Sequence, residues 1–244
     1  MKQFLIIVAL LNCGFSTSPS NSYRELLPIE GILAIRSGYD TNDHVELAVW
    51  GYLPNGCYRL SRSEAQVDVQ AKKIYVQVES YVRDQKACHD VISPFLEVIK
   101  VGFLDAGQYQ IESSVNPEVT DFLQVDGSSS SAQDNFLYAP VDQAELIDTE
   151  SQNANLLQLK GTYPHLIEGC MRIVDVKTQF LPNNVLVVQP IADILKNSLC
   201  RKEDVDGHNR FSYKVTLTQG LKNKGLIHVR TPTGRALNQF VNFN

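Results

Sequence analysis

The chain lacks the features by which several classes of protein are usually recognised. Its 244 residues carry a formal net charge of −5 with no cluster of Lys and Arg, which argues against a nucleic-acid-binding protein. A membrane-spanning helix needs about 20 consecutive apolar residues, and no apolar run in the chain approaches that length. The five histidines form no His-x-x-x-His pattern, and there is no Cys-x-x-Cys, Gly-x-Ser-x-Gly or phosphate-binding glycine-rich motif. We therefore expect no cofactor, no bound nucleic acid and no enzymatic activity, the alternative being an enzyme whose catalytic residues are far apart in the sequence.

The first residues are typical of an export signal. Met1 and Lys2 supply a positive start, and residues 4–11 form a run of eight apolar side chains. Such a run suits the hydrophobic region of a signal peptide, which we predict over residues 1–18. The alternative is a buried first strand.

Two cleavage sites compete within this segment. Residues 10–13 read Leu-Leu-Asn-Cys and resemble a bacterial lipobox, in which the cysteine becomes the lipidated first residue, although Asn12 stands where Gly, Ala or Ser is usual. Ordinary cleavage after Ser16 or Ser18 is the alternative. We expect lipidation of Cys13, because the apolar segment ends there and because the other four cysteines can pair with one another in disulfides, as described next.

The five cysteines are informative because an odd number in an exported protein needs an explanation. With Cys13 lipidated or removed, four remain, and they fall into two pairs with the same internal spacing of roughly 30 positions. The four allow three connectivities, of which Cys57–Cys88 with Cys170–Cys200 keeps each half of the chain self-contained. Free buried thiols would suit a cytosolic protein, and the signal segment argues against them.

The sequence around the two cysteine pairs repeats. Each pair follows a Gly and a Pro, and each is followed by a Phe in an alternating stretch and then by another Gly. The matched positions are Pro28 and Pro140, Gly51 and Gly161, Pro54 and Pro164, Leu60 and Ile173, Phe95 and Phe211, Gly107 and Gly225, and Phe122 and Phe240. We interpret the repeat as a tandem duplication of one small module, with differences in loop length.

Alternating hydrophobicity predicts that each module is made of strands. Residues 74–78 and 211–217 place apolar side chains at every second position, so that one face of each strand is apolar. Turn signals separate such stretches at short intervals, as in a sandwich or barrel. We predict an all-β chain of two tandem Ig-like β-sandwich domains, each with one disulfide. The domains would span residues 28–125 and 140–244, joined by a flexible Ser/Gly-rich linker at 126–139.

One motif resembles a known family. The pattern Gly-x-Leu-Pro-x-x-Cys, a second cysteine about 30 residues later and then Leu-x-Ala-Gly-x-Tyr is similar to small β-sandwich modules of secreted bacterial proteins and lipoproteins. The first copy carries this pattern at Gly51, Leu53, Pro54, Cys57, Cys88, Leu104, Ala106, Gly107 and Tyr109. The second copy keeps Gly161, Pro164, Cys170, Cys200, Leu221 and Gly225 but has Ile227 at the tyrosine position. The resemblance implies fold and compartment and no particular activity.

One loop is a weak candidate for a cation site. Asp204, Asp206 and Asn209 offer oxygen ligands beside Gly207, an arrangement that calcium uses, but a third acidic position and a closing Glu are missing. The plain interpretation is a polar loop, and we expect no metal.

These observations predict a non-catalytic protein of the cell envelope or surface. It would be held by lipidated Cys13 at the outer membrane or cell surface, or otherwise be periplasmic or secreted. It would serve as an adhesion, structural or interaction module that contacts another envelope or extracellular protein. The alternative is a secreted inhibitor or a periplasmic ligand-binding protein with its contacts in loops 165–169 and 201–210.

Overall fold

In the computed structural model, the described residues are 22–36, 38–83, 87–132, 134–149, 154–167, 169–196, 200, 209–217, 221 and 224–241. Within these ranges every regular element is a β-strand except one 3₁₀ turn, His165–Ile167. The all-β class predicted from alternation is therefore confirmed. The predicted signal peptide at 1–18, with Cys13, and residues 201–208 lie outside the described ranges.

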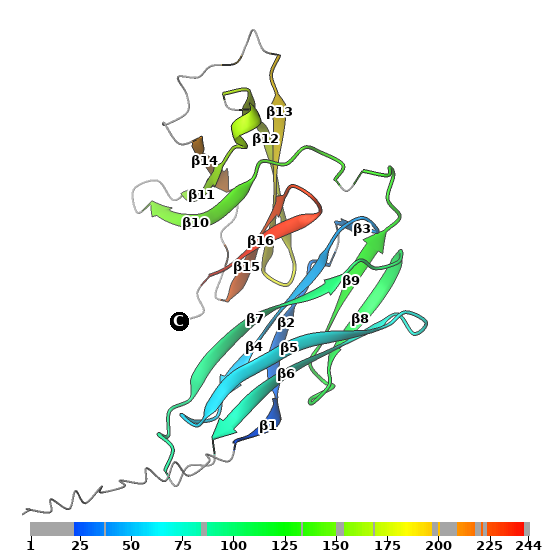
Figure 1. Cartoon of the computed structure of the whole chain (residues 1–244), viewed down its shortest axis with the longest axis vertical. Helices are drawn as coiled ribbons and strands as arrows, with labels where there is room; N and C mark the ends of the chain where they lie inside the picture. The colour runs from blue at the N-terminus through cyan, green and yellow to red at the C-terminus, as the bar shows by residue number, and fades with distance from the viewer. Residues whose placement is uncertain are drawn as a thin grey trace, which may run out of the picture.

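The first module is a sandwich of two sheets (Figure 1). One sheet has the order β2-β4-β7, and the other has the order β1-β6-β8-β9-β3 with β5 paired to β6. The strands are β1 (Ser22–Leu27), β2 (Ile29–Leu33), β3 (Tyr39–Asp40), β4 (Val45–Leu53), β5 (Tyr58–Asp68), β6 (Lys73–Arg83), β7 (Ser93–Gly102), β8 (Gly107–Ser113) and β9 (Thr120–Asp126).

The second module repeats this plan with fewer strands. Its sheets have the orders β10-β11-β14 and β12-β13-β15-β16. In each module, the second sheet contains a parallel pair, β6 with β8 and β13 with β15, between antiparallel neighbours. The strands are β10 (Val141–Thr149), β11 (Ala154–Thr162), β12 (Met171–Leu181), β13 (Val185–Ile194), β14 (Arg210–Leu217), β15 (Gly225–Thr231) and β16 (Arg235–Val241).

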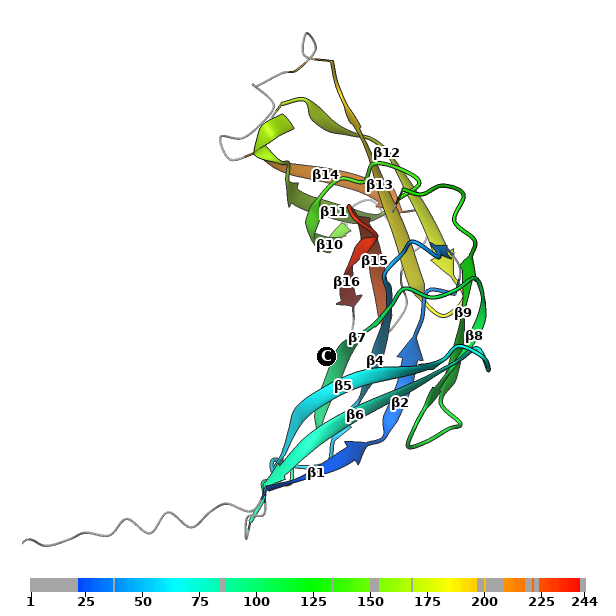
Figure 2. The same cartoon turned by 45° about the vertical axis from the view of Figure 1, so that its right-hand side comes forward.

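The two modules follow one another along a curved long axis (Figure 2), and β15 of the second lies against the end of the first that holds Tyr39 and Asp43. Each module has its own buried apolar cluster. The cluster of the first module also takes in residues of the second, namely Leu181, Val185, Val187 and Leu226. Because burial of one such side chain stabilises by roughly 1.5–3 kcal/mol, the modules are joined by an apolar contact and not only by the chain.

Both predicted disulfides form. Cys57 pairs with Cys88 across 31 positions, and Cys170 pairs with Cys200 across 30. Each bond closes a loop within one module, as the repeat predicted. In the chain-entropy model, closing a loop of this length stabilises a module by roughly 3–4 kcal/mol.

One matched pair of glycines in the repeat, Gly51 and Gly161, has a common structural reason. Gly51 lies opposite Phe95 on β7, and Gly161 lies opposite Phe211 on β14. A Cβ on Gly51 would come within 2.7 Å of the Phe95 ring and 2.9 Å of the Pro28 carbonyl oxygen. At Gly161 the same added atom would meet Phe211 and the Pro140 carbonyl. In both modules a ring and a backbone oxygen occupy the space of a side chain.

Two features differ from the sequence predictions. Strand β1 pairs with β6, so the first module extends ahead of residue 28. The predicted linker is held by polar contacts: Asn42 donates to the backbone oxygens of Ser130 and Ala132 at 2.9 and 3.0 Å.

Replacing Gly51 by Ala should destabilise the protein by about 1–3 kcal/mol, because the added methyl overpacks Phe95 and a backbone oxygen that cannot move away alone. The matched control is Gly127→Ala, since Gly127 is exposed with nothing within 4 Å of the added atom. Urea unfolding under oxidising conditions measures both. Equal midpoints for the two variants would contradict this explanation of the glycine.

Candidate functional site

One face of the β12-β13-β15-β16 sheet is turned towards the first module. Its side chains form cross-strand rows because residues paired in neighbouring strands point to the same side. The row nearest the first module is apolar and enters that module's core. It consists of Leu181 paired with Val185, and Leu226 paired with both Val185 and Phe240.

The next two rows along this face become progressively more polar. In one row, Gln179 pairs with Val187, Val187 with His228, and His228 with Asn238. In the row beyond it, Lys177 pairs with Gln189, and Arg230 follows His228 by two residues on β15. This sheet face therefore changes from apolar to cationic within three rows.

The position of this sheet between the two modules explains why residues 185–188 form a continuous apolar run and do not alternate. Val185 to Val188 and the first six residues of β15 are all buried, because one side of each strand packs in the second module and the other side packs on the first. Strands buried on both faces have continuous apolar runs and no alternation. The loss of alternation at residues 185–188, compared with 74–78, was the signal for this contact.

Arg230 and Asp43 form a buried ion pair between the modules. Their side chains are only 7% and 3% exposed. Burial alone would lower the pKa of Arg230, but the hydrogen bond and the charge of Asp43 outweigh burial and raise it. Asp134, from the segment that joins the modules, lies 3.8 Å from the same guanidinium. The ring centroids of Tyr39, in the first module, and of Tyr138, in the segment that joins the modules, lie 5.9 and 5.7 Å from the Arg230 guanidinium carbon.

His228 belongs to a second polar chain across the same contact. Its Nδ1 lies 2.8 Å from Asn238 Oδ1, and the Asn238 amide donates to Glu46 Oε2 at 2.6 Å. Because an amide oxygen can only accept, Nδ1 carries the proton and Nε2 keeps a lone pair. Burial, chiefly, lowers the pKa of His228 from 6.5 to about 3, so the ring is neutral at physiological pH.

Two turns complete the contact between the modules. The Asn183 amide donates to the Ala34 backbone oxygen at 2.8 Å. The turn between β15 and β16 docks through Gly234, whose oxygen accepts from the His44 amide at 3.0 Å. The carboxylate of Asp134 accepts from the amides of Thr233 and Gly234. Gly234 has φ +66° and an added Cβ would lie 3.0 Å from the Asn42 oxygen, so a glycine is favoured at this position.

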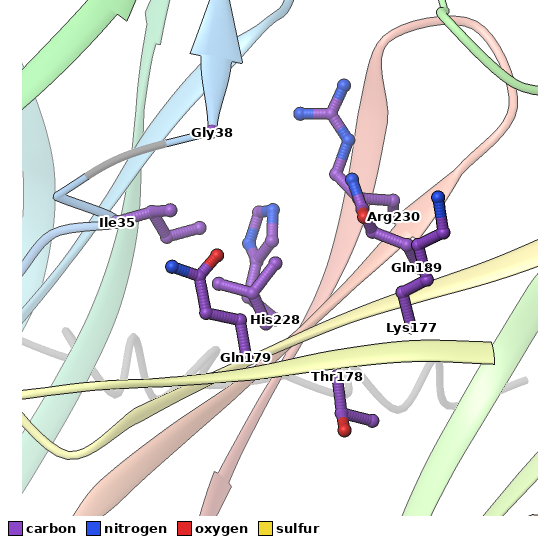
Figure 3. A pocket seen from close by; sticks show the side chains of 9 residues that line it. Ile35, Gly38, Lys177, Thr178, Gln179, Gln189, His228 and Arg230 are labelled. Carbon is purple, nitrogen blue, oxygen red and sulfur yellow. The ribbon is translucent and has the colours of Figure 1, made fainter.

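A cleft of about 260 Å³ lies beside these contacts (Figure 3). The first module contributes Ile35 and Gly38, and strands β12, β13 and β15 contribute the remainder. Figure 3 shows the side chains of Gln179 and His228 rising from the sheet next to Ile35, with Lys177, Gln189 and Arg230 grouped on the other side. We refer to this space, lined by Ile35, Gly38, Lys177, Thr178, Gln179, Val187, Gln189, His228 and Arg230, as the inter-module cleft.

The cleft brings together residues that the sequence predictions did not single out. Among the predicted site residues, the four bridged cysteines lie in their own modules and serve the fold. Asn209 is buried, with its Nδ2 at 2.6 Å from His165 Nδ1, and Asp204 and Asp206 lie outside the described residues. Within the described part of the chain, no three acidic, His or Cys side chains gather as a metal site would require.

Comparison with known proteins supports the fold of the first module. A family model described as the ORF11 β-sandwich domain matches residues 47–122, which run from β4 into β9. No curated protein and no solved structure matches the chain. Among the described residues, no helix is long and apolar enough to cross a membrane.

Removing the carboxylate of the buried ion pair should be costly. In Asp43→Ala the buried Arg230 charge loses its hydrogen-bonded partner and keeps only Asp134 at 3.8 Å, and we expect a loss of about 3 kcal/mol in the free energy of unfolding. The control is Glu145→Ala, which breaks the exposed pair with Lys160 and should cost at most about 1 kcal/mol. Chemical denaturation measures both, and equal losses would show that the buried pair contributes no more than a surface pair.

His228 should make stability fall as the pH falls. Between pH 6.5 and about 3 the unfolded chain protonates this histidine while the folded chain does not, so acid favours unfolding. Asp43 and Glu46 act in the opposite direction, because burial raises the pKa of each carboxyl.

Comparison of wild type with His228→Gln isolates the histidine, since both carboxyls are present in the two proteins. The stability difference, wild type minus variant, should decrease by about 1.4 kcal/mol per pH unit below pH 6.5. Denaturation curves collected from pH 7 to pH 4 measure it. Parallel pH profiles for the two proteins would disprove a buried neutral His228.

Proposed function

We propose that this chain is an exported, non-catalytic binding protein of the cell envelope, made of two copies of one β-sandwich module locked into a single rigid unit. The observation that carries the proposal is the pair of equivalent disulfides in modules that share a buried polar and apolar contact. Disulfides persist in oxidising compartments, which favours a periplasmic or extracellular location.

Shared irregularities support an origin of the two modules by duplication. In both modules the residue after the matched proline pairs with the matched glycine, Ile29 with Gly51 and Val141 with Gly161. A β-bulge follows at once in each case, before Gly31 and before Gln143.

A second bulge is also matched. It lies between Leu60 and Arg62 in β5 and between Ile173 and Asp175 in β12. Bulges are conserved features of families and not defects, so two matched bulges are better explained by common descent than by the general demands of a sandwich.

The non-catalytic character is supported by how the ionisable groups at the module contact are used. Arg230, Asp43, Glu46 and His228 are bonded to one another or to amides that join the modules. A catalytic acid or base needs a pKa near the working pH, whereas burial moves the pKa of His228 to about 3.

The envelope location rests on the export signal and on lipidation of Cys13. The lipid would hold the first module near the membrane, and the partner would be another envelope or extracellular protein. A secreted inhibitor remains the second candidate. It is favoured by the turn His165–Ile167, which two contacts with Asn209 hold in place. The Asn209 side chain lies against His165, and the Asn209 backbone oxygen accepts from the Tyr163 amide at 2.8 Å.

Replacing Cys13 by Ser should move the protein from the membrane fraction to the soluble periplasmic or secreted fraction without unfolding it, because the residue is not part of either disulfide. Fractionation of a bacterial host and mass spectrometry of the mature N-terminus measure location and lipid. The control is Ser16→Ala, which should leave both unchanged. A wild-type N-terminus without lipid that begins after residue 16 or 18 would reject the anchor.

A further inference from the structure

The two most exposed large apolar side chains of the described residues are neighbours at one end of the first module. Val91 and Ile92, in the segment before β7, are 57% and 66% exposed, and Tyr23, in β1 at the same end, is 54% exposed. We refer to these three residues as the apolar tip. Single exposed apolar residues are ordinary on protein surfaces, whereas a group of them marks a contact surface.

The strand pairings place the apolar tip where the described chain begins. β1 begins where β6 ends, since Ser22 pairs with Arg83. β7 begins directly after Ile92 and pairs there with the end of β4. The Cys57–Cys88 disulfide joins the segment before β7 to the start of β5. Figures 1 and 2 show this end of the first module on the side away from the second module.

Side chains typical of a membrane interface surround the apolar tip. Tyr81 pairs with Arg24 on β1 and with Arg59 on β5, so the three form one exposed row on the outer face of the sheet. Tyrosine is enriched at the level of the lipid headgroups, and arginine can bury its carbon chain there while its charge stays in water. The same end exposes the acids Glu25 and Asp90, so its rim carries charges of both signs, as a layer of zwitterionic headgroups does.

The sequence limits how far this end can lie from the proposed lipid. Residues 14–21 are all that separates Cys13 from Ser22. Even a fully extended chain of that length spans at most roughly 30 Å. Because the chain enters the fold at the start of β1, a lipid on Cys13 holds the apolar tip near the bilayer and leaves the second module further away. A short tether of this kind keeps the tip at a high effective concentration beside the lipid, which makes a weak contact persistent.

We propose that the apolar tip rests on the bilayer to which the chain is anchored. Val91 and Ile92 lie at the boundary between the headgroups and the acyl chains, and Tyr23 and Tyr81 lie among the headgroups. The first module then stands on the membrane, and the second module faces away from it. This inference rests on the proposed attachment at Cys13 and assigns a lipid surface, and not a protein, to the tip.

Fluorescence quenching by lipid tests the contact without relying on lipidation in a cell. In the oxidised chain from Cys13 onwards, Cys13 is the one thiol outside the disulfides, so it can be coupled to a maleimide lipid in vesicles of phosphatidylethanolamine and phosphatidylglycerol. Lipids brominated in the acyl chains should quench the indole of Ile92→Trp at least about twofold more than that of the control Val174→Trp, since an interfacial side chain reaches the acyl boundary. Val174 is 47% exposed and belongs to the second module, and Trp50 contributes equally to both variants.

A pair of double variants tests whether the tip itself binds lipid. In the same chain with Cys13→Ser, which has no tether, Val91→Ser with Ile92→Ser should lower the partition onto these vesicles at least about tenfold, because two apolar side chains no longer leave water. The matched control is Val174→Ser with Ile194→Ser, which removes the same two side-chain types from exposed positions of the second module and should partition as the parent chain does. Urea midpoints confirm that both double variants are folded.

Either of two results would overturn the proposal. Equal quenching of the two introduced indoles would show that the apolar tip faces water or a protein partner and not the bilayer. Equal partition of the two double variants would place any lipid contact elsewhere on the chain. Absence of lipid on Cys13 in the cell is a separate result, read from the mass of the mature N-terminus, and it leaves both measurements valid because neither uses the biological lipid.

Discussion

The ion pair between Arg230 and Asp43 is the constraint around which the two modules are arranged. A charge that leaves water for a protein interior is costly unless its partner is correctly placed. Asp43 lies in the turn after β3, and Arg230 lies near the end of β15, so the pair restricts how the two modules can be placed relative to each other. The pair does more for geometry than for net stability, since a well-packed apolar pair of the same volume would often stabilise as well.

Several other contacts follow from this placement. With Arg230 at Asp43, the turn after β15 reaches His44, and Asp134 can bind the amides of that turn while it approaches the same guanidinium. The chain between the modules is thereby tied to both of them. A Ser- and Gly-rich composition is typical of a flexible coil when the segment makes no contacts with the rest of the fold. Here the turns after β3 and after β15 bind the segment, and both are distant from it in sequence.

The sheet that carries Arg230 serves three purposes along one face. Its apolar row completes the core of the first module, its middle row forms the chain from His228 to Glu46, and its cationic row lines the cleft. The opposite face packs in the core of the second module. We expected the divergence between the two copies to lie in the loops before Cys170 and after Cys200. The strands β13 and β15 also differ from their counterparts β6 and β8, because both of their faces are buried over most of their length.

The sequence by itself determined the strands, the two-module plan and the disulfide pairing. These depend on patterns visible in the sequence: alternation at 74–78 and 211–217, and a spacing of 31 and 30 positions within the two cysteine pairs. Only the tertiary structure decided how the modules meet and which polar residues share a cleft. Arg230 and Asp43 are 187 positions apart, and Asn238 and Glu46 are 192 apart. No local pattern relates them, because their interaction is set by the docking of one folded sheet on another.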